Sequence, residues 1–188
     1  FIKRVINSSR SELRRLAQHP TATTAYIHGQ QIGKSHNLAV VPSNMVSAPT
    51  VSLKRQSIVV MLPSGHSLAD QQVQQSIKTV VAKALRVEAK AHLPKRLAYL
   101  AAQHGFTYQK VRFSHRGGRW GSCSSSGTIS LNIALMKLPH ELIDYVIVHE
   151  LCHTRHMNHS AGFWNEVKTY DPLYKLHKQQ IKQQTPSV

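Results

Sequence analysis

The segment from residue 138 to residue 153 constrains this chain more than any other part of the sequence. It is almost continuously apolar, it begins with a Leu-Pro pair, and it ends with the letters H-E-L-C-H. Proline is favoured at the start of a helix, so the segment predicts a helix that begins near Pro139 and runs through His153. A helix of this composition must be buried over most of its surface. The fold is therefore expected to be built around it.

Two histidines of this helix are spaced so that both can bind one metal ion. At about 100° per residue, His149 and His153 point nearly the same way, one turn apart. Two imidazoles at that spacing can bind one tetrahedral Zn²⁺ at about 2.0–2.1 Å. Glu150 lies about 80° from the centre of that face, where it can reach a metal-bound water without binding the metal. Four apolar residues on the opposite side are expected in the core: Ile143, Ile147, Val148 and Leu151.

A third protein ligand is needed, and the histidines that follow the motif supply candidates. In a continued helix, His156 would lie about 10 Å along the axis from His149, so these two and His153 could not share one ion. We therefore expect a turn at residues 157–158 that returns His159 to the metal, which gives H-E-x-x-H-x5-H. His156 remains the second choice, and Cys152 is a weaker one.

Three neutral ligands leave the fourth position of zinc to water, which is the catalytic arrangement. Zinc lowers the pKa of that water toward about 7, and Glu150 can take its proton as a general base. The sequence contains no G-x-S-x-G, no P-loop and no G-x-G-x-x-G motif that would indicate another chemistry. The expected cofactor is one Zn²⁺ per chain, and the expected activity is hydrolysis.

Charge and cysteine content limit the partners and the compartment. The chain has 188 residues, with 24 Lys and Arg against 8 Asp and Glu, and a net charge of +16. Such an excess favours weak binding of a polyanion, either a nucleic acid or a nucleotide, through residues 1–15, 78–96 and 110–119. No apolar run reaches the roughly 20 residues of a membrane span, so no membrane partner is expected. Two cysteines give no disulfide framework, which predicts a cytoplasmic protein.

The pattern along the chain predicts an α+β fold. We expect a basic N-terminal extension over residues 1–23, a β-rich part over 24–66 and a hydrolase core over 67–188, with 24–188 forming one domain. Short β-prone runs separated by Gly, Pro, Ser and Asn indicate a small antiparallel sheet. A helix is expected to begin at Ser67, to break or restart at Pro94 and to stop at Gly105.

Arg119 to Cys123 follows a Gly-Gly turn and has two interpretations. As a strand, it could line the cleft and pair with an extended peptide, and Arg119 could stabilise an oxyanion. Alternatively, Trp120 is a core anchor and Gly121 a point of close packing. We favour packing roles for Trp120 and Cys123, and also for Phe163 and Trp164, and we retain Arg119 as a candidate catalytic residue.

Taken together, the motifs resemble one known family. R-W-G-S-C at 119–123, I-S-L-N at 129–132, H-E-L-C-H at 149–153 and N-H-S at 158–160 occur in the order of the YgjP-like family of metal-dependent hydrolases. The similarity covers residues 70–180 well and extends more loosely from about residue 24. A more distant similarity links the chain to SprT and WLM DNA-associated proteases.

The resemblance implies a zincin-like α+β fold, with a small sheet packed against the metal-bearing helix. It also implies metal ligands at His149, His153 and His159, with Glu150 as the catalytic base. A zinc metallopeptidase acting on a peptide or protein is the leading hypothesis. One alternative is a nucleoside triphosphate pyrophosphohydrolase, although paired carboxylates for Mg²⁺ are missing. Another is a nucleic-acid-associated protein whose structural zinc takes Cys152 or Cys123 as its fourth ligand.

Overall fold

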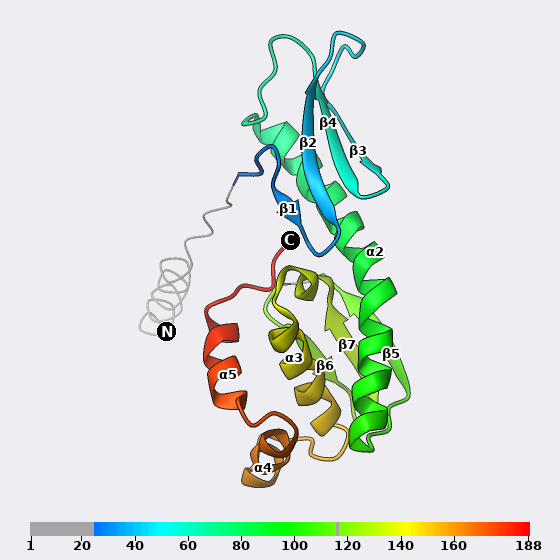
Figure 1. Cartoon of the computed structure of the whole chain (residues 1–188), viewed down its shortest axis with the longest axis vertical. Coiled ribbons are helices and arrows are strands. Elements are labelled where there is room, and N and C mark those ends of the chain that lie inside the picture. Colours follow the sequence, from blue (N-terminus) through cyan, green and yellow to red (C-terminus); the bar gives the residue numbers. More distant parts are fainter. Residues whose placement is uncertain (1–24, 116) are drawn as a thin grey trace, which may run out of the picture.

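A computed structural model describes residues 25–115 and 117–188 of the chain. The expected basic extension over residues 1–23 lies outside these described residues. The predicted α+β class is confirmed: small sheets pack against helices, including the helix that carries H-E-x-x-H. Figure 1 shows one sheet beside the first half of a long helix and a second sheet with three further helices beside its other half. Within the described residues, no helix has both the length and the apolar character that crossing a bilayer requires.

The first sheet is mixed, whereas the sequence analysis predicts an antiparallel one. Its strands are β1 (Gln31–Ile32), β2 (His36–Pro42), β3 (Thr50–Lys54) and β4 (Ser57–Leu62), in the order β1-β2-β4-β3. β2 and β4 pair in parallel, with Leu38 opposite Ile58, while the other two pairings are antiparallel. The chain places the β3–β4 hairpin beside β2, so β3 becomes an edge strand. Sequence neighbours alone do not specify such a non-local pairing.

A single long helix supports both sheets. α2 (Gln71–His104) begins after a turn at 67–70 and continues through Pro94, where the sequence predicts a break. Proline removes one helical hydrogen bond, but the buried side chains on both sides of Pro94, such as Leu93 and Leu97, keep the helix packed. The helix ends as predicted at Gly105, whose φ of 69° lies in the left-handed region that glycine adopts readily.

The second sheet is also mixed and provides one wall of the candidate site. Its strands are β5 (Lys110–Ser114), β6 (Gly121–Cys123) and β7 (Thr128–Asn132), in the order β5-β7-β6. β5 and β7 pair in parallel and β6 and β7 pair antiparallel. β6 is therefore an edge strand of this sheet, with one side of its backbone not used in pairing within it.

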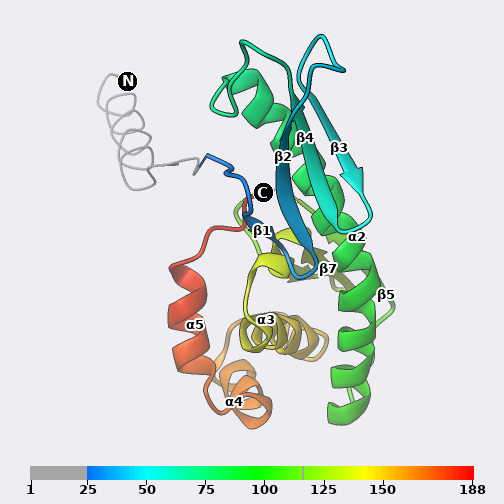
Figure 2. The same ribbon diagram turned by 45° about the horizontal axis from the view of Figure 1, so that its top comes forward.

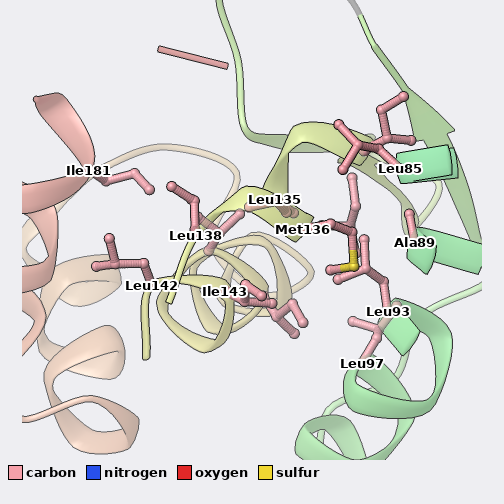
Figure 3. Close-up of a cluster of buried hydrophobic side chains, with 14 of the residues drawn as sticks. Leu85, Ala89, Leu93, Leu97, Leu135, Met136, Leu138, Leu142, Ile143 and Ile181 are labelled. Atoms are coloured by element: carbon pink, nitrogen blue, oxygen red, sulfur yellow. The ribbon is translucent and has the colours of Figure 1, made fainter. Parts of the chain in front are cut away.

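The remaining helices enclose the core between α2 and the C-terminal part of the chain. They are η1, a 3₁₀ helix (Ile133–Lys137), α3 (His140–Cys152), α4 (Ala161–Tyr170) and α5 (Tyr174–Lys182). In Figure 2, α3 lies between α5 and α2. Figure 3 shows side chains from α2, η1, α3 and α5 meeting in one apolar cluster. The four residues of α3 predicted to face the core, Ile143, Ile147, Val148 and Leu151, are all buried, which confirms that prediction.

A buried carboxylate joins the first sheet to α2. Glu88 is 6% exposed and accepts hydrogen bonds from the backbone N–H groups of Lys34 (2.7 Å) and Ser35 (2.9 Å). The buried ring of His36 contacts the same carboxylate through Nδ1 at 2.5 Å. A Cβ atom at Gly33 would collide with this carboxylate, so the loop approaches it closely. Glu88 therefore satisfies several donors that would otherwise be buried without an acceptor.

We expect Glu88→Ala to lower the free energy of unfolding by about 3 kcal/mol, because the buried backbone N–H groups of Lys34 and Ser35 and the ring of His36 lose their hydrogen-bond partner. Denaturant unfolding measures the loss. Glu141→Ala is the matched control, because Glu141 is an exposed glutamate of α3. A loss below about 1 kcal/mol, the size of one ordinary hydrogen bond, would show that the Glu88 contacts contribute little.

Candidate metal centre

The structure brings His149, His153 and His159 together. The Nε2 atom of His159 lies 3.1 Å from Nε2 of His149 and 3.2 Å from Nε2 of His153. Zn–N distances of about 2.0–2.1 Å imply nitrogen separations of about 3.3 Å around a tetrahedral ion. The three nitrogens converge at close to that spacing, and the donor set suits zinc. The residues present therefore fit a divalent metal, and the ligand assignment stays a prediction.

The turn that returns His159 begins earlier than predicted. α3 ends at Cys152, the chain turns at residues 153–155, and it bends again at 157–158, where the sequence predicts a turn. The backbone carbonyl of His156 then accepts a hydrogen bond from Nδ1 of His153 at 2.8 Å. That bond places the proton on Nδ1 and leaves Nε2 free for a metal. The side chain of His156, the second choice as ligand, instead pairs with Glu166 at 3.1 Å.

Aromatic rings pack around the three histidines. The fully buried Phe163 has its ring centroid 4.9 Å from that of His149, 4.5 Å from that of His153 and 4.8 Å from that of His159. Trp164 stacks on His159 at 5.5 Å, with 23° between the ring planes. Phe163 and Trp164 follow directly in α4, so this helix holds the His159 loop against α3. The packing role predicted for both rings agrees with these contacts.

Arg155 anchors the same loop to the rest of the fold. Its guanidinium donates to Glu166 of α4 at 2.6 Å and to the backbone carbonyl of Gly105, at the end of α2, at 2.5 Å. It also lies 4.1 Å from the centroid of the Phe106 ring. Sequence reasoning missed this residue, because its partners come from two distant segments, residues 105–106 and α4, and no local spacing links them.

Glu150 is buried beside the histidines and has a free carboxylate oxygen. The residue is 5% exposed, and its Oε2 atom has no hydrogen-bond partner among the described residues. Burial raises the pKa of Glu150 to about 8, and the positive charge of Arg119 opposes that rise. Burying a carboxyl without a partner for one of its oxygens is costly, and a strongly shifted pKa beside a cavity marks Glu150 as a candidate functional residue.

Burial favours the neutral, metal-binding form of two of the candidate ligands, His149 and His159. The pKa of His149 is lowered to about 3 by burial, with smaller contributions from His153, His159 and Lys178. The pKa of His159 is lowered by burial as well. A neutral imidazole is the metal-binding form. The lowered pKa values therefore favour the state of His149 and His159 that can bind a cation.

A cavity of about 220 Å³ adjoins Glu150. Its polar lining consists of Arg119, His149 and Glu150, and its other walls are formed by Trp120, Gly121, Tyr145, Val146 and Ile181. The sequence-predicted Arg119 and Glu150 thus share one cavity. Ile181 was not singled out by the sequence, because α5 approaches α3 only through the tertiary fold.

Buried Asn132 fixes the strand side of this cavity. Its side-chain amide donates to the carbonyl of Arg119 at 3.0 Å, and its backbone N–H donates to the carbonyl of Trp120 at 2.9 Å. Its side-chain oxygen accepts from the backbone N–H of Ala134 at 3.0 Å. Asn132 was visible in the sequence as part of I-S-L-N, but its role was not predictable without the register of β7 and β6.

Neither cysteine joins the histidine cluster in the described part of the chain. Cys152 is fully buried, and burial raises the pKa of its thiol to about 12. Cys123 is half-buried, and burial followed by the nearby charge of Glu150 raises the pKa of its thiol. Within the described residues, neither sulfur belongs to the group of ligand atoms that could share one ion. This arrangement disfavours a closed structural site with a thiolate ligand.

The close contact between Glu150 and Gly121 gives a direct prediction. A Cβ atom at position 121 would lie 2.6 Å from Oε1 and 2.7 Å from Cγ of Glu150. We expect Gly121→Ala to displace the Glu150 carboxylate and to lower kcat by about 10²-fold, the low end of the usual contribution of a general base. Metal content should not change, because no histidine is touched. Unchanged kcat would show that the position of Glu150 is not critical.

The chain is similar to one known protein family. The chain matches the family described as "YgjP-like, metallopeptidase domain" over residues 2–184. A search of the curated proteins found no match.

The solved structures that match include two metallopeptidase zymogens. Abylysin of Pyrococcus abyssi is 28% identical, with a TM-score of 0.43, and the match covers 47% of this chain and 90% of that one. Jannalysin of Methanocaldococcus jannaschii is 22% identical, with a TM-score of 0.43, and the match covers 48% of this chain and 93% of that one. Since the family match extends over nearly the whole sequence, the chain belongs to the YgjP-like metallopeptidase family.

Proposed function

We propose that this protein is a zinc-dependent peptidase in which His149, His153 and His159 hold the metal and Glu150 is the general base. The observation that carries the proposal is the convergence of three Nε2 atoms next to a buried, unpartnered carboxylate oxygen. Family membership supports a metal-dependent peptidase. The surroundings of the side chains support the specific roles. The ligand atoms of the three histidines lie close to one another, and Glu150 lines the cavity next to His149.

The bound ion would supply Lewis acidity, which polarises the scissile carbonyl and acidifies water. The chain's own residues then have defined tasks. His153 is held in the Nδ1-protonated tautomer by the carbonyl of His156. Glu150 accepts a proton from the attacking water at its carboxylate and passes it to the leaving nitrogen. The peptide C–N bond breaks, the water oxygen remains on the carboxyl product, and the proton ends on the amine.

The substrate is proposed to be an extended peptide. β6 is an edge strand next to α3, so its free backbone side can pair with a substrate segment by strand addition. Gly121 brings this strand into contact with Glu150. Arg119 lies just before β6 and supplies positive charge in the cavity. The sequence predicts that this charge stabilises an oxyanion. A cytoplasmic location stays a prediction from the cysteine content.

The alternatives are less well supported by the described residues. A structural zinc would need a thiolate, and neither cysteine lies in the histidine cluster. A triphosphate-cleaving enzyme would need paired carboxylates for Mg²⁺, whereas Glu150 is the cavity's one carboxylate within the described residues. The comparisons give no support for nucleic-acid binding. Peptide hydrolysis is therefore the function that we propose.

The proposal is tested by removing and restoring the metal. The full chain is treated with a chelator, dialysed and reloaded with one equivalent of Zn²⁺, and hydrolysis of a mixed peptide library is followed by mass spectrometry at each stage. Nucleoside triphosphates are assayed in parallel. Peptide cleavage that is lost with the metal and restored by zinc supports the proposal. Triphosphate cleavage without peptide cleavage contradicts the proposal, and so does peptide cleavage that the chelator does not reduce.

A further inference from the structure

The cavity beside Glu150 is displaced from the centre of the histidine cluster. On α3 it is lined by Tyr145, Val146, His149 and Glu150, while His153 and His159 are not part of its described lining. Tyr145 precedes His149 by one helical turn, about 6 Å along the axis. One extended residue spans about 3.3–3.6 Å. A group that fills this cavity is therefore one or two residues away from the bond cleaved at the metal.

The cavity walls suit one side chain. At about 220 Å³, the space is smaller than the roughly 300 Å³ of the smallest pockets for drug-sized ligands. Trp120, Tyr145, Val146 and Ile181 make most of its surface apolar. An apolar side chain that displaces water from these walls gains the usual hydrophobic free energy. The volume and the apolar walls of the cavity therefore favour an apolar or long aliphatic side chain.

Arg119 adds a positive charge to these walls. Its side chain is exposed, and among residues 25–115 and 117–188 no hydrogen bond or ion pair engages its guanidinium. Its backbone is nevertheless fixed, because Asn132 binds the carbonyls of residues 119 and 120. The charge of Arg119 acts on Glu150 in the same cavity. Because no side chain among the described residues hydrogen-bonds its guanidinium, the group is suited to a planar, bidentate anion such as a carboxylate.

We propose that this cavity binds a peptide residue close to the scissile bond that combines an aliphatic or aromatic part with a carboxylate, and that Arg119 holds the carboxylate. This inference rests on the proposed peptidase function and names its substrate class. The carboxylate has two sources. It is the α-carboxylate when the residue is the C-terminal one, and it is the side chain when the residue is an internal glutamate or aspartate.

The position of Arg119 favours a substrate carboxylate over an oxyanion. An oxyanion forms on the attacked carbonyl, next to the histidine cluster, whereas the cavity that Arg119 lines extends toward the turn of α3 before His149. The two roles have different kinetic signatures. Loss of an oxyanion donor lowers kcat for every substrate, while loss of a carboxylate anchor removes the preference for charged over neutral substrates.

Four peptides with a common fluorescent N-terminal half test the proposal on the zinc-loaded full chain. Two end in phenylalanine, as the free acid and as the amide, and two are amidated and carry an internal glutamate or glutamine after the cleaved bond. We expect kcat/KM for a charged peptide to exceed that of its neutral partner by about tenfold or more, as charge-assisted hydrogen bonds imply. The pair that shows this preference identifies the source of the carboxylate.

Arg119→Gln should abolish the preference. Arg112→Gln, an exposed arginine of β5 outside the cavity, should leave it unchanged. Equal rates for both members of each pair in the wild type, or a preference that survives Arg119→Gln, would overturn the proposal. An equal loss of kcat on all four peptides would assign Arg119 to the oxyanion and would also overturn it.

A binding measurement separates this inference from the proposed function. N-acetylphenylalanine and its amide are compared by ligand-observed NMR with the zinc-loaded and metal-free chain. The acid should bind the wild type more tightly than the amide, and Arg119→Gln should remove the difference. If no peptide is cleaved, the peptidase proposal fails, but this comparison still decides the role of Arg119. Equal binding of the acid and the amide to the wild type contradicts the inference. A preference for the acid that depends on zinc and is unchanged in Arg119→Gln contradicts it as well.

Discussion

His153→Ala is expected to lower zinc affinity by more than about a hundredfold and to abolish hydrolysis. Loss of a partner that only orients a ligand already costs about 10–100-fold in metal affinity, so loss of a ligand atom costs more. His153 contributes Nε2 to the cluster and is held by the carbonyl of His156 through Nδ1. Two histidines alone would remain, and the ion would lose its fixed position. Metal analysis after dialysis and a competition titration with a chromophoric chelator measure the loss.

His140→Ala is the matched control for this variant. His140 is the first residue of α3 and is exposed, so the change removes a histidine from the same helix without touching the cluster. We expect one zinc per chain and unchanged affinity in this control. Zinc content that is the same in His153→Ala and the wild type would place the metal elsewhere. A loss in both variants would indicate that α3 itself was disturbed.

Glu150→Gln is expected to lower kcat by about 10²–10⁴-fold, the usual contribution of a general base. Glutamine has nearly the same shape, but its amide cannot accept the proton of the attacking water. The metal content should remain at one ion per chain, because Glu150 contributes no atom to the histidine cluster. Stability should hold at neutral pH, because burial raises the pKa of Glu150 to about 8 and so already favours its neutral form there. Steady-state kinetics, metal analysis and thermal unfolding give the three readouts.

Glu141→Gln provides the comparison, since Glu141 lies exposed in the first turn of the same helix. It should leave kcat unchanged. Wild-type turnover by Glu150→Gln would exclude Glu150 as the base. Loss of zinc from Glu150→Gln would instead indicate that Glu150 binds the metal, which the geometry of the three histidines does not predict.

The convergence of the candidate ligands was predictable because it depends mainly on local geometry. His149 and His153 share a helix, so their spacing follows from 3.6 residues per turn. The return of His159 needed only a change of chain direction after the helix, and the structure shows a turn at 153–155 followed by a bend at the predicted residues 157–158. The burial of the opposite face followed from its composition. Which side chains close the cavity was not predictable, because Ile181 and Tyr145 meet through the packing of α5 on α3.

The strand pairings show where local patterns fail. Alternating β-prone runs identified β2, β3 and β4, but nothing in them states that β2 and β4 run parallel. Parallel pairing of β5 and β7 likewise depends on a connection that passes through β6. Pro94 was expected to interrupt α2, yet buried neighbours keep the helix continuous. In each case a tertiary contact outweighs a local preference.

The buried polar residues were the least visible in the sequence. Glu88 and Asn132 look like ordinary members of a helix and a strand, and their importance comes from partners far along the chain. Glu88 ties the first sheet to α2, and Asn132 fixes the backbone from which Arg119 projects. Both are positioning residues that only the three-dimensional arrangement identifies.

Diffraction from crystals of the zinc-loaded protein, recorded on both sides of the zinc absorption edge, tests the central claim most directly. The account predicts one anomalous peak per chain, about 2.0–2.1 Å from the Nε2 atoms of His149, His153 and His159. A peak that includes the sulfur of Cys152 or Cys123, or one centred away from these three rings, would contradict it.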